Sequence, residues 1–414
     1  MQIKLDEKAF ASVFRAGDSR RFGLDLKKDR ASIASKAMMD SDGGYEKYGP
    51  IHTTLVNNRR CNSVKDYSQA LILRILAGFI ARRFRVDIKN RDRMVRGVIE
   101  GLSDSTPIFI VRRDISSFYE SIPTEGLIKR LTQDIFIPAL LRRHINSFFS
   151  TFFLSTKAGV PRGICVSPIL AELAIEAFDK SVKNLPGVYK YFRYSDDILI
   201  FSHLPTTEIE SRLPNLLPPG MVFNEKKSFS IALNCDDKAN QVAHSMEYLG
   251  YSYKVSNFCG SKDPRVVEVC ISDRKILKLK MRIFRCFKVY QKEGNFELLR
   301  DRLRFLSGNY VVLRHGVTAI KSSKFVKSGI FYNYRLCGTY IKGGFKSHSG
   351  NELKSLDGIY QALIKPTATI GSRLTASQYQ YLRQISFFKG FELKLMTRFS
   401  QGRVVQMKRA WRNG

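Results

Sequence analysis

Two adjacent carboxylates, Asp196 and Asp197, have the setting in this chain that most strongly indicates chemistry. They follow Tyr-Ser between residues 190–193 and 198–201, two runs rich in Tyr, Phe, Ile and Leu. Such runs, joined by a short Ser-Asp turn, predict a β-hairpin that holds both acids at its tip. Acids in such a position usually hold a metal ion. The other acidic pair, Asp236-Asp237, has polar neighbours and indicates only a solvated loop.

A third acid, Asp114, follows a short apolar run over residues 108–111. The run is β-prone, so Asp114 is expected just beyond a buried strand. Taken alone, Asp114 has a simpler interpretation, which is a salt bridge to a neighbouring arginine such as Arg112 or Arg113. Its distance in sequence from the hairpin acids means that only the folded chain can bring the three together.

A loop with several glycines and prolines, residues 159–170, lies between these two acidic segments and opens a helix predicted to run to about Val182. Three carboxylates with such a loop suit nucleotidyl transfer. That reaction uses two divalent cations roughly 3.5–4 Å apart, one for the attacking hydroxyl and one for the leaving phosphate. Mg²⁺ prefers hard oxygen ligands and needs only a few carboxylates. The predicted ligands are Asp114, Asp196 and Asp197, with the carbonyl of Ile115 as a further one.

The three segments, in this order, resemble motifs A, B and C of reverse transcriptases. The resemblance implies an RNA-directed DNA polymerase that uses dNTPs and two Mg²⁺ ions, with Mn²⁺ as a substitute. It also implies an α+β right-hand fold, with fingers, a palm built on a small antiparallel sheet with helices on one face, and a helical thumb.

Further site residues follow from the same resemblance. Tyr119, five residues after Asp114, matches the aromatic under the sugar of the incoming nucleotide, where a ring excludes a 2′-hydroxyl. A buried core tyrosine is the alternative. Gly163 and Ser167 match the motif B loop that supports the templating base pair. Arg162 stands where many relatives have glutamine, and its charge and forked donors make its contacts with substrate differ from those of glutamine.

Two later segments resemble motifs D and E. Lys227 matches the lysine that protonates the departing pyrophosphate, which is general-acid chemistry, with a plain surface lysine as the alternative. Tyr248, Leu249 and Gly250 match the primer grip, with an ordinary core β-turn as the alternative. In the fingers, Arg59 and Arg60 precede a helix-like run and are candidates for the triphosphate, unless they belong to a solvated face.

The charge of the chain indicates a polyanionic partner. Lys and Arg number 69 against 37 Asp and Glu, a net charge of +32, and from residue 271 onward 29 basic residues face 7 acidic ones. Phosphate binding by so basic a region is expected to be steeply salt-dependent. Residues 275–290 have helical periodicity, with apolar residues on one side. The basic residues predicted to contact nucleic acid on the other side are Lys275, Lys278, Arg282, Arg285 and Lys288. Binding to a membrane surface is the competing interpretation.

The order of these features predicts the domains. Helices are expected over residues 64–84 and 91–102, and no internal repeat is found. The predicted divisions are an N-terminal region with fingers at 1–104, a palm at 105–260 with a fingers insertion at 123–156, a helical thumb at 270–335, and a basic helical C-terminal extension at 336–414.

The composition limits the class of protein and the cellular compartment that we expect. The chain has 44% hydrophobic residues, as a globular protein does, and no signal peptide or membrane span is expected. Its 7 cysteines, with no Cys-x-x-Cys pair, argue against a disulfide framework or a zinc knuckle. We therefore expect a cytoplasmic protein with reduced thiols and no membrane partner.

Residues 167–174, 302–310 and 327–334 resemble the stand-alone "unknown group" reverse transcriptases of bacterial antiphage defence. This resemblance implies DNA synthesis on a dedicated noncoding RNA, in an assembly with a second defence protein or further copies of the chain. A mobile-element reverse transcriptase, of the diversity-generating or group II intron type, is one alternative. A non-catalytic RNA-binding scaffold is another, and the three intact aspartates argue against it.

Overall fold

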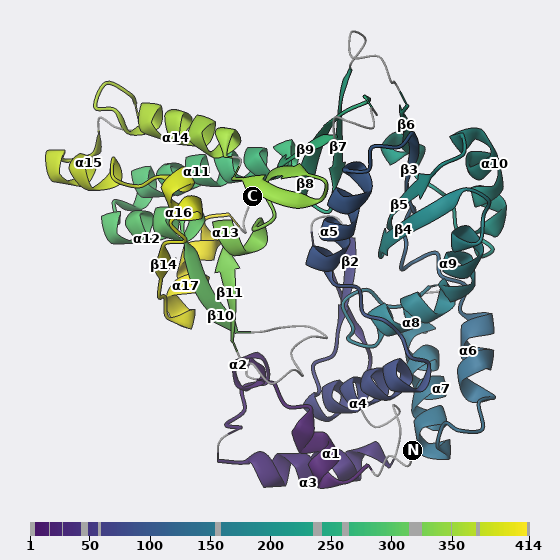
Figure 1. Cartoon of the computed structure of the whole chain (residues 1–414). Coiled ribbons are helices and arrows are strands. Elements are labelled where there is room, and N and C mark those ends of the chain that lie inside the picture. Colours follow the sequence, from purple (N-terminus) through teal and green to yellow (C-terminus); the bar gives the residue numbers. More distant parts are fainter. Residues whose placement is uncertain are drawn as a thin grey trace. The chain divides into compact units, whose positions relative to one another are not determined.

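The structure is a computed structural model in which the chain forms two units (Figure 1). The described residues of the first unit lie within 1–90 and 108–232, and those of the second lie within 91–107, 233–313 and 325–414. The described residues are 5–15, 17–26, 28–42, 49–56, 59–153, 159–234, 242–258, 265–313, 325–348, 350–369 and 373–411. The acidic pair Asp236-Asp237 lies outside them.

The N-terminal part of the first unit is a layer of helices beside one β-hairpin. Its elements are α1 (Glu7–Ser12), α2 (Asp18–Phe22), α3 (Arg30–Ser41), β1 (His52–Val56), β2 (Arg59–Ser63) and α4 (Tyr67–Arg83). The α4 helix begins where the side chain of Asp66 accepts a hydrogen bond from the backbone N–H of Gln69 at 2.7 Å. The predicted helix at 64–84 is thus confirmed, with its start three residues later.

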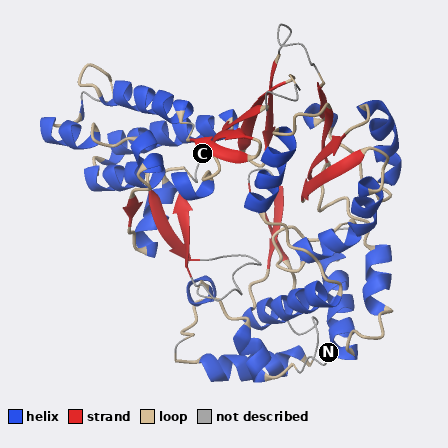
Figure 2. Ribbon diagram, viewed as in Figure 1, coloured by secondary structure: helices blue, strands red, loops and turns tan. Residues whose placement is uncertain are grey.

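A four-stranded sheet forms the centre of the first unit, in the order β4-β5-β3-β6 (Figure 2). The strands are β3 (Ile108–Asp114), β4 (Val188–Tyr194), β5 (Asp197–Ser202) and β6 (Phe229–Leu233). Strand β5 pairs antiparallel with both β3 and β4, which confirms the predicted hairpin. Four successive residues of β5, Ile198 to Phe201, are fully buried, because the strand lies in the middle of the sheet.

The other elements of the first unit are mostly helices. They are α6 (Glu125–Thr132), α7 (Ala139–Phe153), α8 (Ser167–Ala174), α9 (Glu176–Lys183), α10 (Thr206–Leu216) and the 3₁₀ turn η2 (Glu225–Lys227). The prediction of one helix through Val182 was wrong, because Ile175 leaves helical geometry and divides it into α8 and α9. The two halves pack on different partners, α8 on α4 and α9 on β4.

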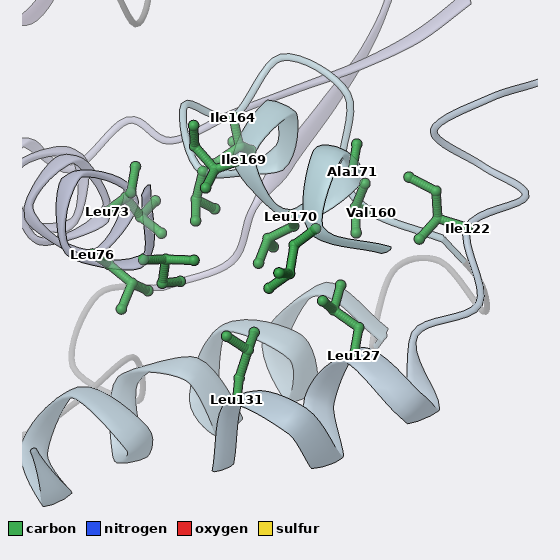
Figure 3. Packing of buried hydrophobic residues seen from close by; sticks show 14 of the residues in the cluster. Leu73, Leu76, Ile122, Leu127, Leu131, Val160, Ile164, Ile169, Leu170 and Ala171 are labelled. Carbon is green, nitrogen blue, oxygen red and sulfur yellow. The ribbon is translucent and has the colours of Figure 1, made fainter. Parts of the chain in front are cut away.

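The apolar core of the first unit connects the motif B loop to the helices. Leu73 and Leu76 of α4, Leu127 and Leu131 of α6, and Ile164 and Leu170 of the loop and α8 gather in one cluster (Figure 3). Because all of these side chains are buried, displacement of the loop exposes apolar surface, at a cost of ~25 cal/mol for each Å².

The second unit contains α5 (Arg91–Leu102) and a five-stranded antiparallel sheet in the order β13-β12-β9-β8-β7. The bounds of α5 match the prediction. The sheet strands are β7 (Ala243–Tyr248), β8 (Tyr251–Ser256), β9 (Val266–Ile271), β12 (Gly338–Ile341) and β13 (Gly344–Ser347).

The remaining elements of the second unit combine helices with a small sheet. They are α11 (Asp273–Glu293), α12 (Phe296–Ser307), β10 (Asn309–Leu313), β11 (Phe325–Gly329), α13 (Ile330–Asn333), α14 (Asn351–Ile364), α15 (Ala376–Leu382), α16 (Phe387–Glu392), β14 (Met396–Thr397) and α17 (Gln401–Arg409). The expectation that residues 270–414 are helical was therefore incomplete. Asn309 anchors the strands: it is fully buried, and its side chain bonds to the carbonyl of Gly390 and the backbone N–H of Phe331.

The predicted α+β class is confirmed, because the sheets are built mainly of antiparallel strands and the helices lie outside them. Among the described residues, no helix combines the length and the apolar character that crossing a bilayer requires. The five cysteines that the structure describes are all free thiols.

Candidate active site

The hairpin between β4 and β5 places two predicted site acids at a tight turn. Tyr194 pairs with Asp197, so only Ser195 and Asp196 lie between the strands. Ser195 has a φ of 55°, a left-handed conformation that a non-glycine residue rarely adopts. The turn therefore holds Asp196 at its tip and Asp197 at the first position of β5, as the sequence predicted.

A buried arginine, Arg193, supports this turn, and no role was predicted for it from the sequence. Arg193 is 1% exposed, and its guanidinium binds Asp179 at 2.7 Å and Glu172 at 2.7 Å. The same guanidinium donates to the backbone carbonyl of Ser195 at 3.2 Å. Two carboxylates satisfy the buried charge, so the contact to Ser195 gives the turn a rigid support.

The β3 strand brings the third acid to the hairpin. Asp114, the last residue of β3, lies opposite Asp197 in the sheet register. The backbone N–H of Ile115 donates to the carbonyl of Asp196 at 2.9 Å, which joins the segments beyond the end of the strand. The structure therefore brings the three predicted aspartates and Ile115 to one end of the sheet.

The electrostatics of the two hairpin acids reflect their proximity to Asp114. Burial raises the pKa of Asp196, and the negative charge of Asp114 raises it further. Burial likewise raises the pKa of Asp197, an effect that Arg112 opposes and that Asp114 and Asp196 reinforce. Carboxylates with raised pKa values beside one another are typical of sites that bind cations or move protons.

Two basic side chains form ion pairs with these acids. Lys227, in η2, has its Nζ 3.0 Å from both carboxylate oxygens of Asp114. Arg112 binds Asp197, with its Nε at 3.0 Å and Nη2 at 3.3 Å. The alternative that Asp114 pairs with Arg112 or Arg113 was wrong, since Arg113 pairs with Glu210 at 3.0 Å.

Two of the three acids are thus paired with basic side chains. Among the described residues, no group of three or more His, Cys, Asp or Glu side chains is set as a ready metal site. The donor chemistry nevertheless fits Mg²⁺, because three carboxylates from adjoining strand ends present hard oxygens. The negative charge of Asp114 contributes to the raised pKa values of Asp196 and Asp197.

Asp114 and Asp196 line a cavity of about 440 Å³, whose charged side chains are basic in excess. Arg59 and Arg60, Asp114 and Asp196, Glu120, Arg162 and Lys227 all line it. Arg59 and Arg60 were expected before a helix, and the structure places them on β2. The charge of Arg59 lowers the pKa of Asp196, which places its guanidinium within electrostatic reach of the acids.

Tyr119 and Arg162 lie together on one side of the site. The guanidinium of Arg162 is 5.1 Å from the centroid of the Tyr119 ring and binds both carboxylate oxygens of Glu120, at 3.1 and 3.0 Å. Burial raises the pKa of Tyr119, and a hydrogen bond with Ser195 opposes that rise. Glu120, which the sequence analysis passed over, thus sets the position of the Arg162 side chain.

The motif B loop is tied to the β1–β2 hairpin through its backbone. The N–H of Asn62 donates to the carbonyl of Arg162 at 2.6 Å. Gly163 has a φ of 99°, and a Cβ there would lie 2.6 Å from the carbonyl oxygen of Asn62. Ser167 is fully buried and donates to the carbonyl of Pro161 at 2.7 Å, so in this structure it supports the loop.

The predicted primer-grip residues form the turn between β7 and β8 in the second unit. Leu249 and Gly250 have φ values of 50° and 81°, while Tyr248 is 1% exposed. Arg91, which the sequence analysis did not single out, donates from Nε and Nη2 to the carbonyl of Leu249, at 2.9 and 2.7 Å. The turn is thus held from α5 of the same unit.

The α11 helix carries the five basic residues that were predicted to contact nucleic acid. Lys275, Lys278 and Lys288 are exposed, and Arg285 is partly so. Arg282 is half-buried, its guanidinium 5.6 Å from the ring centroid of Trp411. Large apolar side chains are also exposed on this helix, namely Leu277, Met281 and Phe284. The exposed surface of α11 is therefore mixed, because apolar side chains stand beside the basic ones.

Comparisons with known proteins bear on the first unit and on part of the second. Residues 76–253 match the family model described as "Reverse transcriptase (RNA-dependent DNA polymerase)". Among curated proteins there is no significant match.

The chain is also similar to solved structures of telomerase. Apo telomerase from Candida tropicalis has 11% identity and a TM-score of 0.36, over 83% of this chain and 57% of that one. Telomerase from Candida albicans, in complex with a TWJ fragment of telomeric RNA, has 12% identity and a TM-score of 0.33, over 94% of this chain and 55% of that one. The chain thus spans little more than half the length of these two structures.

The family match extends over all three acidic site residues, the motif B loop and the β7–β8 turn. The matched segment makes up less than half of the chain and does not include Arg59 and Arg60.

Proposed function

We propose that this protein is an RNA-directed DNA polymerase whose active centre comprises Asp114, Asp196 and Asp197. The observation that carries this proposal is the pairing of Asp114 with Asp197 across β3 and β5, with Asp196 in the adjoining turn. The reaction extends a primer terminus with dNTPs, using RNA as the template.

The three carboxylates and the Ile115 carbonyl would hold two Mg²⁺ ions, for which Mn²⁺ could substitute. Bound there, the ions supply activation of the primer hydroxyl and stabilisation of the phosphate charge. Lys227 and Arg112 neutralise two of the acids in the structure, and both must turn away when cations bind. Lys227 is then free to donate a proton to the leaving pyrophosphate.

The basic residues of the cavity suit the triphosphate. Arg59 and Arg60 project from β2 toward the same cavity as Asp196 and provide forked donors for phosphate oxygens. Tyr119 is proposed to exclude the 2′-hydroxyl of ribonucleotides, and Gly163 to let the loop approach the base pair. Tyr248, Leu249 and Gly250 are proposed to position the primer, while the basic residues of α11 contact the phosphates of the duplex.

We propose a role in bacterial antiphage defence, with a dedicated noncoding RNA as template and a cytoplasmic location. What supports this role is the similarity of residues 302–310 and 327–334 to the defence group, together with a net charge of +22 from residue 271 onward. A second defence protein, or further copies of the chain, would complete the assembly. A mobile-element role is the alternative, and a diversity-generating repeat or intron RNA beside the gene would favour it.

The test is DNA synthesis by purified protein with its co-purifying RNA and labelled dNTPs. Wild type should incorporate label only with Mg²⁺ or Mn²⁺, and the double variant Asp196→Ala, Asp197→Ala should not. A control double variant, Asp87→Ala with Glu208→Ala, removes two exposed acids of the same unit and should retain activity. Product in the Asp196/Asp197 variant would refute the assignment.

A non-catalytic RNA-binding scaffold is the second candidate, favoured by the ion pairs that occupy Asp114 and Asp197. RNA binding without incorporation under any divalent cation would support it. Plaque counts in cells that express the same variants then test the defence role, which requires protection by wild type and its loss in the Asp196/Asp197 variant.

A further inference from the structure

A second cavity, of about 470 Å³, lies in the first unit between the N-terminal helices, α4 and the motif B loop. Arginine is its dominant charged residue: Arg15, Arg21, Arg74 and Arg162 line it, against the single acid Asp18. Leu73 and Ile164, which belong to the apolar core (Figure 3), also line it. The cavity of the catalytic acids shares only Arg162 with it.

The single acid of this cavity is fully engaged. Asp18 accepts from Arg74 through both carboxylate oxygens, at 2.5 and 2.7 Å. It also accepts from the Tyr67 hydroxyl at 2.9 Å and from the backbone N–H of Arg15 at 2.8 Å. Arg74 is therefore neutralised, and Asp18 has little capacity left for another cation. Arg162, which also lines the cavity, is likewise paired, with Glu120.

Arg15 differs from Arg74 and Arg162 because its side chain forms no ion pair with a described carboxylate. Its Nε is buried and has no hydrogen-bond partner among the described residues. Burial lowers the pKa of Arg15, and the neighbouring charge of Arg74 lowers it further. Arg21 adds a second positive charge beside it, with no carboxylate within ion-pair distance in the described part of the chain. A buried donor without a hydrogen-bond partner is costly on a half-buried cation such as Arg15, and such groups call for an explanation.

We propose that this cavity binds a phosphate group, held by Arg15 and Arg21. An anion there would satisfy the buried donor and relieve the repulsion between arginines. Forked guanidinium groups match phosphate oxygens better than they match simple halides. The phosphate belongs to an RNA strand or to a nucleotide. That choice of source rests on the proposed polymerase function, whereas phosphate binding itself does not.

The Arg15→Gln variant tests the proposal because it should affect the melting temperature of the free protein and the stabilisation by phosphate in opposite directions. Removal of this half-buried charge, whose Nε has no hydrogen-bond partner among the described residues, should leave the melting temperature of the free protein unchanged or raise it. The same variant should lose the stabilisation that inorganic phosphate gives to wild type, about 4 °C at roughly one hundred times the Kd. Arg15→Lys keeps the charge but loses the fork, so it should retain only part of that shift.

The matched control is Arg30→Gln, which removes an exposed arginine of the same N-terminal region that does not line the cavity. It should keep the full phosphate shift. The proposal is overturned if Arg15→Gln binds phosphate as tightly as wild type, or if wild type shows no saturable phosphate shift. The full chain without divalent cations is used throughout, so a failure of polymerase activity does not affect this result.

Three further ligands identify the source of the phosphate. Weakened binding of a dNTP by Arg15→Gln points to a nucleotide. Weakened binding of 5′-phosphorylated RNA but not of 5′-hydroxyl RNA points to an RNA end, and equal weakening of both points to phosphates within the strand. A tenfold or greater loss with at least one ligand is expected, and unchanged affinity for all three would contradict the proposal.

Discussion

The Nζ of Lys227 lies 3.0 Å from each carboxylate oxygen of Asp114, although the two residues are 113 positions apart in the chain. The lysine predicted from sequence to protonate pyrophosphate is therefore already at the acids, where it occupies the place that a cation would take. If Asp114 holds a metal ion as proposed, Lys227 would compete with that ion for the carboxylate, which experiment can test.

Replacement of Lys227 by Ala should slow nucleotide incorporation by about 10²-fold or more, as expected for loss of a general acid. Because Asp114 then has no competing cation, the concentration of Mg²⁺ needed for half-maximal rate should fall. Single-turnover incorporation across a Mg²⁺ titration measures both effects. Lys226→Ala, at the adjacent exposed lysine, serves as the control. A rate within twofold of wild type would remove Lys227 from the chemistry.

The Asp196→Asn variant should be inactive yet more stable than wild type in the absence of metal. The folded state raises the pKa of Asp196, chiefly through burial, so the folded protein holds the proton more readily than the unfolded chain. Wild type therefore loses stability as pH rises through that pKa, and the variant does not. The melting-temperature advantage should be larger at pH 8 than at pH 4, and an advantage that grows toward acid would contradict this account.

Arg193→Met should destabilise the protein by about 3–5 kcal/mol, because it leaves Asp179 and Glu172 without their buried partner. Urea unfolding monitored by circular dichroism gives the value. Arg212→Met is the matched control, since Arg212 pairs with Glu208 on the exposed side of α10 and should cost no more than about 0.5 kcal/mol. Equal effects of the two changes would show that the support beneath the Ser195 turn is unimportant.

Gly163→Ala should reduce both stability and incorporation. Its φ of 99° disfavours any Cβ, and the Cβ would lie 2.6 Å from the carbonyl oxygen of Asn62. We expect a loss of more than about 1 kcal/mol and a weaker dNTP affinity, measured by unfolding and by steady-state KM. Gly126→Ala, on α6 with no atom within 4 Å of the new Cβ, should instead be neutral or slightly stabilising.

Local patterns in the sequence were sufficient to predict the elements that carry the acids. The β4–β5 hairpin, α4 and α5 follow from periodicity and turn residues that act over a few positions. Where the prediction was wrong, distant partners decided: the motif B helix divides at Ile175 because its halves pack against α4 and β4. The contact of Arg282 with the ring of Trp411, near the end of the chain, likewise depends on a distant residue.

The sequence by itself determined the kind of chemistry, because three acids in their motifs, with so basic a composition, specify metal-dependent work on nucleic acid. Only the tertiary structure decided which charges meet. Arg112 binds Asp197 and not its neighbour Asp114, Arg193 binds Asp179 beneath the Ser195 turn, and the Nε of Arg15 is buried without a hydrogen-bond partner among the described residues. The physical reason is that strand and helix patterns are local, whereas the pairing of buried charges depends on residues that folding brings together from distant positions.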